Sequence, residues 1–363
     1  MRPILISLPI VAVMAVPALA QTPAPAPGSG VDVGGLVDVY YDFYSTRPAG
    51  DAPFRNFDTK HNQFALSMAE IWLAKAATAD ARAGFKVRLN FGPAATLIHA
   101  AEPGGQQIFQ NIEEAYASYL APAGKGLQID AGIFVTQHGA EVVEAKDNWN
   151  YSRSLLFVLA MPAYHAGVRF TYPVSDRVTV MGDVVNGWNN VVENNTGKTV
   201  GGQITYKPSG KLSIVQNYMA GPEQPGNNDD WRQLSDTTVS YSVTDALSLM
   251  ANYDYGHDTI GGDGVHWQGI GGYAKYQVRK WLALSPRFEY YDDASGFTTG
   301  VAQKLKDATF TVELKGTDTL LWRIEYRGDF SNRAVFRDSG DRENKNQQSI
   351  GFGVLYSFAG KVQ

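Results

Sequence analysis

The residues most able to act on a solute are three cations that share one face of a strand-length run. In residues 81–91 every odd-numbered residue is apolar, whereas Arg82, Lys86 and Arg88 occupy even-numbered positions. Alternation places the two sets on opposite faces of a β-strand. A strand buried in a soluble protein would not hold three cations on one face, because unpaired buried charges are costly. The row is therefore expected to meet water, where it can attract, orient or repel small charged solutes.

Sequence patterns for covalent catalysis are weak. No G-x-S-x-G nucleophile elbow occurs, and the tripeptide GKT at 197–199 has Val192 where a phosphate-binding loop needs its first glycine. The histidines fall in expected loops or at strand ends, without the H-E-x-x-H spacing of a zinc enzyme. A Ser-His pair brought together only by folding stays open as the site of a lipid-hydrolysing barrel, because such pairs are set by geometry. We expect a protein that is not an enzyme.

Composition limits the classes of ligand. The chain contains no cysteine, which excludes disulfides and thiolate metal sites. Its net charge of −5 does not favour nucleic acid as a partner. Acidic loop clusters at 227–230 and 338–341 offer the oxygen ligands that calcium prefers, but they match no calcium-loop template. They are interpreted as solvated loops, and no cofactor or metal site is predicted.

The alternation that defines the cationic row recurs from residue 31 to residue 358. In residues 320–329, 282–291 and 350–358, one face is apolar or aromatic and the other carries charged or small residues. After residue 20 no stretch approaches the ~18 consecutive apolar residues of a membrane-spanning helix. Strands with one apolar and one wet face predict an all-β fold, a transmembrane antiparallel up-and-down β-barrel with an aqueous interior.

The ends of the chain indicate export. Residues 1–20 have a positive start, an apolar centre and the small-x-small pattern Ala18-Leu19-Ala20, which is typical of a cleaved signal peptide. Residues 21–30 are rich in Pro, Ala and Gly and are expected to be a flexible periplasmic tail. The barrel is expected to occupy residues 31–358, and residues 359–363 a short extension.

The number of strands follows from the connections. Seven short connections are rich in turn-forming residues, and eight long ones separate them, which together join 16 strands. An even number with both termini on the short-turn side suits a bacterial outer-membrane barrel. Barrels of 14 or 18 strands remain alternatives, because two of the runs alternate poorly. The long connections are expected near residues 45–61, 92–110, 136–162, 188–199, 220–234, 257–266, 292–304 and 330–346.

Two stretches carry a family resemblance. The segments IEEAYASYLAPAGKGLQIDAGIFVTQHGAE (112–141) and NWNYSRSLLFVLAMPAYHAGVRFTYPVSD (148–176) resemble the putative beta-barrel porin-2 family of Gram-negative outer-membrane proteins. The resemblance implies location in the outer membrane, contact with its lipids and lipopolysaccharide, assembly as a homotrimer and passive channel function. One departure is that the C-terminal aromatic residue expected of porins, Phe358, is followed by five more residues.

The third long connection, residues 136–162, is the candidate constriction. The resemblance implies that it folds into the lumen, where its acids would face the cationic row and create a transverse field that filters small polar solutes. An alternative is that the apolar segment 155–161 simply begins a strand. A second is that the lumen charges only form a solvated face. The candidate pore-lining or constriction residues are Arg82, Lys86, Arg88, Glu141, Glu144, Arg153, Arg287 and Arg323.

The sequence therefore predicts an outer-membrane porin that passes small hydrophilic solutes or ions by diffusion through a water-filled pore narrowed by the third long connection. The mixed charges of the inward faces predict no sign of ion preference. An adhesin or structural barrel is the alternative from another class, and a conducting pore is the property that separates the two.

Overall fold

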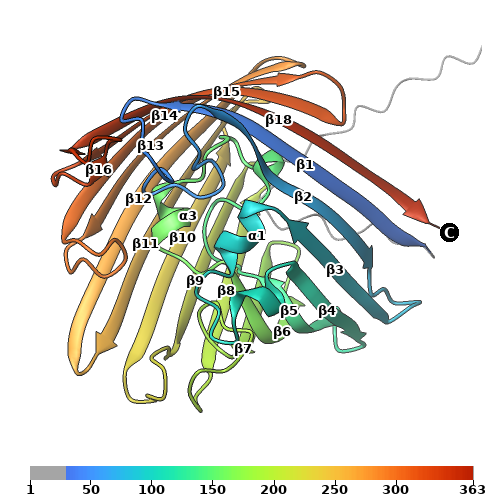
Figure 1. Cartoon of the computed structure of the whole chain (residues 1–363). Helices are drawn as coiled ribbons and strands as arrows, with labels where there is room; N and C mark the ends of the chain where they lie inside the picture. Colours follow the sequence, from blue (N-terminus) through green and yellow to red (C-terminus); the bar gives the residue numbers. More distant parts are fainter. Residues whose placement is uncertain (1–29, 363) are drawn as a thin grey trace, which may run out of the picture.

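The computed structural model describes residues 30–362 and forms a closed antiparallel barrel (Figure 1). Strands adjacent in sequence pair with each other, and β18 closes the barrel by pairing with both β15 and β1. The predicted fold class and the count of 16 barrel strands are confirmed. The predicted signal peptide and nearly all of the predicted tail lie outside the described residues. The barrel strands are β1 (Val31–Tyr44), β2 (Gln63–Lys75), β3 (Ala83–Phe91), β4 (Ile112–Ala121), β5 (Leu127–Val135), β6 (Tyr164–Pro173), β7 (Val178–Val185), β8 (Thr199–Ser209), β9 (Leu212–Pro222), β10 (Trp231–Ser242), β11 (Leu247–Ile260), β12 (Asp263–Arg279), β13 (Leu282–Asp293), β14 (Gln303–Lys315), β15 (Leu320–Ser331) and β18 (Asn346–Val362).

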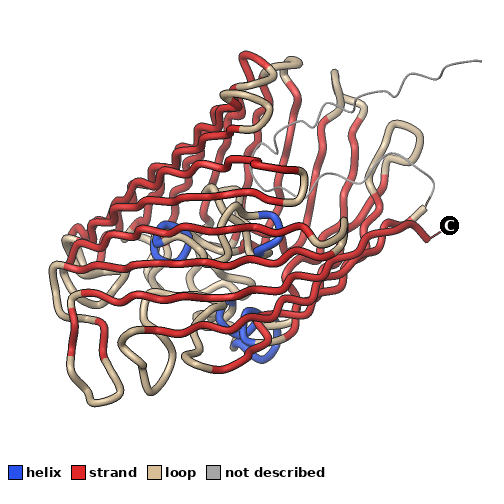
Figure 2. Tube along the Cα trace, turned by 90° about the horizontal axis from the view of Figure 1, so that it is seen from above, coloured by secondary structure: helices blue, strands red, loops and turns tan. Residues whose placement is uncertain are grey.

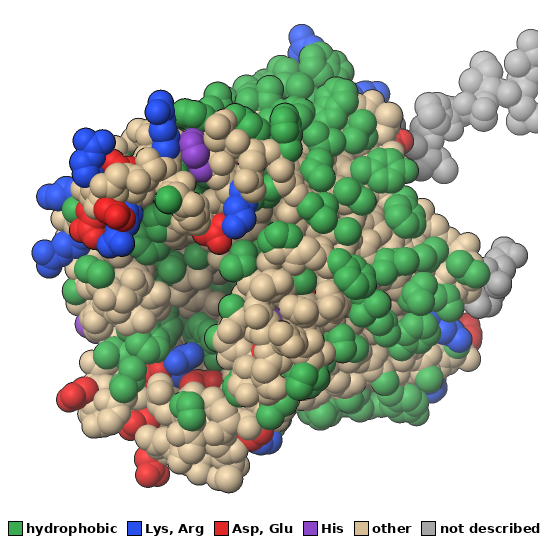
Figure 3. Space-filling model, in the orientation of Figure 1, with side chains coloured by type: hydrophobic (Ala, Val, Ile, Leu, Met, Phe, Trp, Pro, Cys, Tyr) green, Lys and Arg blue, Asp and Glu red, His purple; other side chains and the backbone are tan. Residues whose placement is uncertain are grey.

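The predicted faces are also confirmed. On β15, Trp322, Ile324 and Tyr326 are exposed on the outer surface, whereas Arg323 and Arg327 are completely buried in the interior. Figure 3 shows hydrophobic side chains gathered over the outer wall. Because the strand pairing closes on itself, backbone hydrogen bonds are satisfied around the barrel, as a bilayer requires.

Some predicted boundaries are wrong. The expected long connection at 257–266 is a tight hairpin, because β11 and β12 extend until only Gly261 and Gly262 join them. Both glycines have positive φ, which suits the twist of a two-residue hairpin turn. The last strand also passes Phe358, and its end pairs with the start of β1 through Val362.

The remaining elements are short and lie in the long connections. The second connection holds α1 (Pro93–Ile98) and α2 (Gln106–Phe109), and the third holds η1 (Ala145–Asp147) and α3 (Leu155–Leu159). Two small strands, β16 (Phe336–Arg337) and β17 (Glu343–Asn344), pair within the last connection. In the described part of the chain, no helix is long and apolar enough to cross a membrane.

The third loop, defined here as residues 136–163, lies inside the barrel. Figure 2 shows loop segments and short helices enclosed by the strands. The apolar segment that might have begun a strand instead forms α3, whose first turn is capped by the Ser154 hydroxyl accepting a hydrogen bond from Phe157 N. Leu155 and Leu156 pack in an interior cluster with Trp267 and other wall residues. This apolar packing, unlike exposure in an outer loop, explains why the segment is hydrophobic.

Candidate pore constriction

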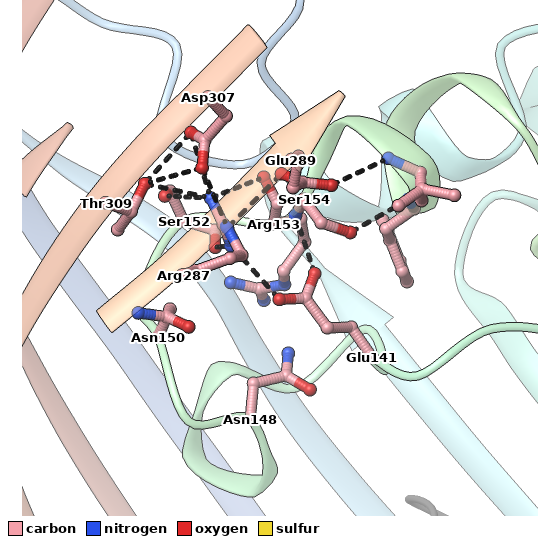
Figure 4. Close-up of polar contacts among 12 residues, drawn as sticks. Glu141, Asn148, Asn150, Ser152, Arg153, Ser154, Arg287, Glu289, Asp307 and Thr309 are labelled. Carbon is pink, nitrogen blue, oxygen red and sulfur yellow. Dashed lines mark hydrogen bonds and ion pairs between the residues drawn. The ribbon is translucent and has the colours of Figure 1, made fainter. Parts of the chain in front are cut away.

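A buried ion cluster fixes the third loop to the β13–β14 wall (Figure 4). Arg287 on β13 is fully buried. Its guanidinium lies 3.0 Å from Glu141 of the loop and 3.2 Å from both Glu289 and Asp307 of the wall. It also donates a 2.6 Å hydrogen bond to the Ser152 carbonyl oxygen. One arginine thus neutralises acids from both the wall and the loop and binds the loop backbone, in the strong charge-assisted form of hydrogen bonding.

Arg323 on β15 also binds the backbone of the third loop, at residues 145–150. Its guanidinium donates to the carbonyl oxygens of Ala145, Asn148 and Asn150 at 2.5, 2.6 and 2.9 Å. Glu313 on β14 balances its charge at 2.6 Å. Since a guanidinium presents several donors in a rigid plane, it can hold three carbonyls of an irregular segment that has no regular backbone partners.

Wall carboxylates bind the complementary backbone groups. Glu325 accepts hydrogen bonds from Tyr151 N at 2.6 Å and Ser152 N at 2.9 Å. Glu289 accepts from the first two N–H groups of α3, at 2.9 and 3.2 Å. These N–H groups have no partner within the helix, so the carboxylate satisfies them. The loop backbone is therefore held by wall arginines at its carbonyls and by wall acids at its amides.

Arg153, predicted as a pore-lining or constriction residue, joins parts of the loops to each other. It is buried and donates to the carbonyl oxygens of Tyr151 and Val143. Its guanidinium lies 4.9 Å from the centre of the Phe57 ring in the first long connection. This cation–π contact binds the third loop to the first.

The cationic row meets the third loop at Glu144. Arg88 is in direct contact with Glu144 of the third loop. Glu141 lies instead on the other side of the lumen, against Arg287. Arg82 stands just before β3 and donates to the Leu120 carbonyl oxygen at 3.0 Å. Glu141 and Glu144 of the third loop are thus each in contact with a wall arginine.

Lys86 lies where it can act on a solute. Its ammonium pairs with Glu114 of β4 at 2.5 Å, and both residues line a cavity of about 1010 Å³ inside the barrel. The third loop borders this cavity with residues 136–139, 141 and 142, and strands β2–β9 supply most of the rest. A second ion pair in the lining joins Arg169 to Asp130 at 3.1 Å. The lining of the cavity thus carries both signs of charge, which can interact with polar solutes.

Hydrogen bonds to Glu102 join the second and fourth long connections. Glu102, after α1, accepts hydrogen bonds from Val191 N and Val192 N, both at 2.9 Å, and from the Tyr164 hydroxyl at 2.7 Å. Burial alone would raise the pKa of the Glu102 carboxyl, but these hydrogen bonds outweigh burial and hold it below its usual range. Glu102 therefore stays ionised and links the second and fourth long connections.

Sequence reasoning missed Glu113, Glu114 and Asp307. Asp307 follows the regular alternation of β14 and could have been read from it. The two adjacent glutamates could not, because alternation sends neighbours to opposite faces, yet both are buried in the interior. The signal that was available was the poor alternation of this run, which marks an irregularity in the strand.

A closed barrel with an apolar exterior, a charged interior and an inward-folded long connection is the architecture of outer-membrane porins. The sequence matches the family model described as putative beta-barrel porin-2, OmpL-like, over residues 30–358. The chain therefore belongs to this family of Gram-negative outer-membrane channel proteins, and the resemblance predicted from the sequence is confirmed.

Solved structures share the fold at low sequence identity. An anion-selective porin from Comamonas acidovorans is 12% identical with a TM-score of 0.64, covering 91% of this chain and 99% of that one. The outer membrane channel DcaP of Acinetobacter baumannii is 12% identical with a TM-score of 0.60, covering 90% and 97%. A trimer form of the outer membrane protein OmpT of Vibrio cholerae is 13% identical with a TM-score of 0.59, covering 90% and 99%. No curated protein matches the chain.

Proposed function

We propose that the protein is a passive porin in which the third loop narrows the lumen and small hydrophilic solutes or ions pass through the remaining polar space. The observation that carries this proposal is the cavity of about 1010 Å³ between the third loop and strands β2–β9. The ion cluster holds the loop against β13–β15, and the cavity for solutes lies between the loop and β2–β9. Selection then depends on width and charge, with no covalent chemistry.

Assembly as a homotrimer is part of the proposal. The trimeric form of the Vibrio cholerae protein with the same fold supports it. The apolar outer wall would contact lipid and neighbouring subunits, and the outer loops would meet lipopolysaccharide. A structural or adhesive barrel is favoured over a channel by one observation only, the dense packing of the third loop against the wall.

Single-channel recording tests the proposal. The mature protein, refolded in detergent and shown to be folded by heat-modifiable gel mobility, is inserted into a planar bilayer in symmetric salt. Steady ohmic steps are expected, grouped in threes if trimers insert. Folded protein that gives no current would contradict the channel function and favour a structural or adhesive barrel.

Neutralising Lys86 is expected to shift selectivity toward cations. Lys86→Gln removes a positive charge from the cavity and leaves the buried Glu114 carboxylate with Arg88, 3.3 Å away, as its remaining ion-pair partner. The reversal potential in a potassium chloride gradient should move toward the potassium potential. Lys125→Gln, on an exposed turn where Lys125 pairs with Asp176, is the matched control and should leave the potential unchanged. An unaltered potential in Lys86→Gln would remove Lys86 from the conducting path.

Cysteine modification should distinguish the two faces of β8. Thr205 lines the cavity, and its neighbour Ile204 is 54% exposed on the outer wall. Because the natural chain has no cysteine, each single-cysteine variant carries one reactive thiol. A positively charged methanethiosulfonate reagent should reduce the current of Thr205→Cys and leave that of Ile204→Cys unchanged. Equal responses in the two variants would contradict conduction through this cavity.

A further inference from the structure

An irregular pairing of β3 with β4 turns two adjacent glutamates into the barrel. Arg88 lies opposite Glu114, but the next residue, Leu89, lies opposite Ile112, so Glu113 is the extra residue of a β-bulge. Both glutamates are buried on the interior side. A bulge adds one residue to one strand and re-aims side chains, and such irregularities are enriched beside functional sites.

The bulge completes a cluster of carboxylates from three separate elements. Glu70 of β2, Glu113 of β4 and Glu144 of the third loop are all buried, and each offers a carboxylate oxygen within 4.8 Å of the others. Such close approach of like charges in a low-dielectric interior is unfavourable without a counter-charge.

The protein cations near the cluster do not balance it. Glu114 adds a fourth carboxylate, and the cations that form ion pairs with the group are Arg88 and Lys86, which leaves four negative and two positive charges. Arg169, which also faces Glu114, pairs with Asp130 at 3.1 Å. The loop residues beside it, Lys146 and Asp147, pair with each other at 2.6 Å and cancel. Arg88 contacts Glu144 but lies 3.9 Å from Glu70. A surplus of two negative charges therefore remains.

A neutral oxygen ligand lies next to the cluster. Asn90 is 1% exposed, and its Nδ2 donates a 3.1 Å hydrogen bond to the Glu113 carboxylate. Among the described residues, its Oδ1 receives no hydrogen bond, and neither does Glu70 Oε2, whereas Glu113 Oε1 lies 3.5 Å from Arg88. Buried polar atoms almost always have a partner, so two unsatisfied oxygens beside a charge surplus point to a bound cation.

We propose that Glu70, Glu113, Glu144 and Asn90 form a divalent cation site for an ion of the calcium type. All of its ligands are oxygens, which calcium prefers, and a charge of +2 would cancel the surplus of two. The ion would bind the third loop to the β2–β4 wall. This wall is nearly half-way around the barrel from the Arg287 cluster on β13, so the loop would be held on both sides of the lumen.

Calcium binding by the refolded protein tests the site directly. Equilibrium dialysis with radioactive calcium in detergent free of lipopolysaccharide should give one saturable site per chain. Glu70→Gln and Glu113→Gln should each weaken binding by about 10- to 100-fold, as the loss of a ligand or its close support does in metal sites. Glu193→Gln in an outer connection is the matched control and should bind as the parent does. Heat-modifiable mobility establishes that each variant is folded.

Two results would overturn the site: no saturable calcium binding by the folded parent, or binding by both cluster variants as strong as the parent's.

An effect of calcium on conductance rests on the proposed channel function. If the loop is held by the ion, chelation should increase open-channel noise in the parent and not in Glu113→Gln. Dialysis needs no current, so failure of the channel proposal would leave the binding result intact, and calcium-insensitive noise with binding present would overturn only the role in holding the loop.

Discussion

Replacing residues 138–161 by a short glycine-serine linker should raise the single-channel conductance by at least about twofold, because the third loop fills the lumen beside β13–β15 and conduction follows the open cross-section. The deletion is geometrically simple. Thr136 N donates to the Ala163 carbonyl oxygen at 3.0 Å, so the two ends of the loop already lie side by side and a tight turn can join them.

The barrel should survive this deletion. Its strands pair with each other and not with the loop, so the backbone hydrogen bonds around the barrel are retained. The wall charges that lose loop partners, such as Arg323 and Glu325, would face water, which solvates them.

Planar-bilayer recording of the deletion variant beside the parent measures the effect, and heat-modifiable gel mobility establishes the fold. A comparable control shortens the last long connection by removing residues 337–343, which lie in an outer hairpin. That change should leave the conductance near the parent's value. A deletion variant that is folded and conducts like the parent would show that the third loop is not the constriction.

Arg287→Gln should loosen the loop without removing it. The substitution removes the ion-pair partner of the buried Glu141 and Glu289, whereas Asp307 keeps Arg327 at 2.6 Å. Leaving a buried charge without its partner typically costs about 3–5 kcal/mol. The expected results are a lower midpoint of urea unfolding and a larger, noisier open-channel current. The current should lie between that of the parent and that of the loop deletion, because the hydrogen bonds of Arg323 and Glu325 to the loop remain.

The matched control is Arg342→Gln. Arg342 pairs with Asp338 on the outer surface with 85% of its side chain exposed, and such pairs contribute about 0–1 kcal/mol. Its unfolding midpoint and current should match the parent's. Combining Arg287→Gln with Glu141→Gln should cost less than the sum of the two single changes, because the second removes a charge that the first leaves unpaired. Additive effects would contradict a direct coupling between wall and loop.

Local sequence patterns are enough to predict the barrel and the orientation of most strand residues. A period of two is a local property of the chain, so alternation in residues 320–329 correctly placed Arg323 inside and Trp322 outside. Turn-forming residues are equally local, and they gave the count of strands. The inward position of Arg287 followed from the same alternation.

Which charges meet depends on the folded barrel. Glu141 and Arg287 are 146 residues apart, and no local pattern pairs them. The bulge that sends Glu113 inward depends on the partner strand, and the helix α3 gains its stability from wall residues such as Trp267. Strand faces are set by neighbours in sequence, whereas the path of the loop is set by partners that become neighbours only when the barrel closes.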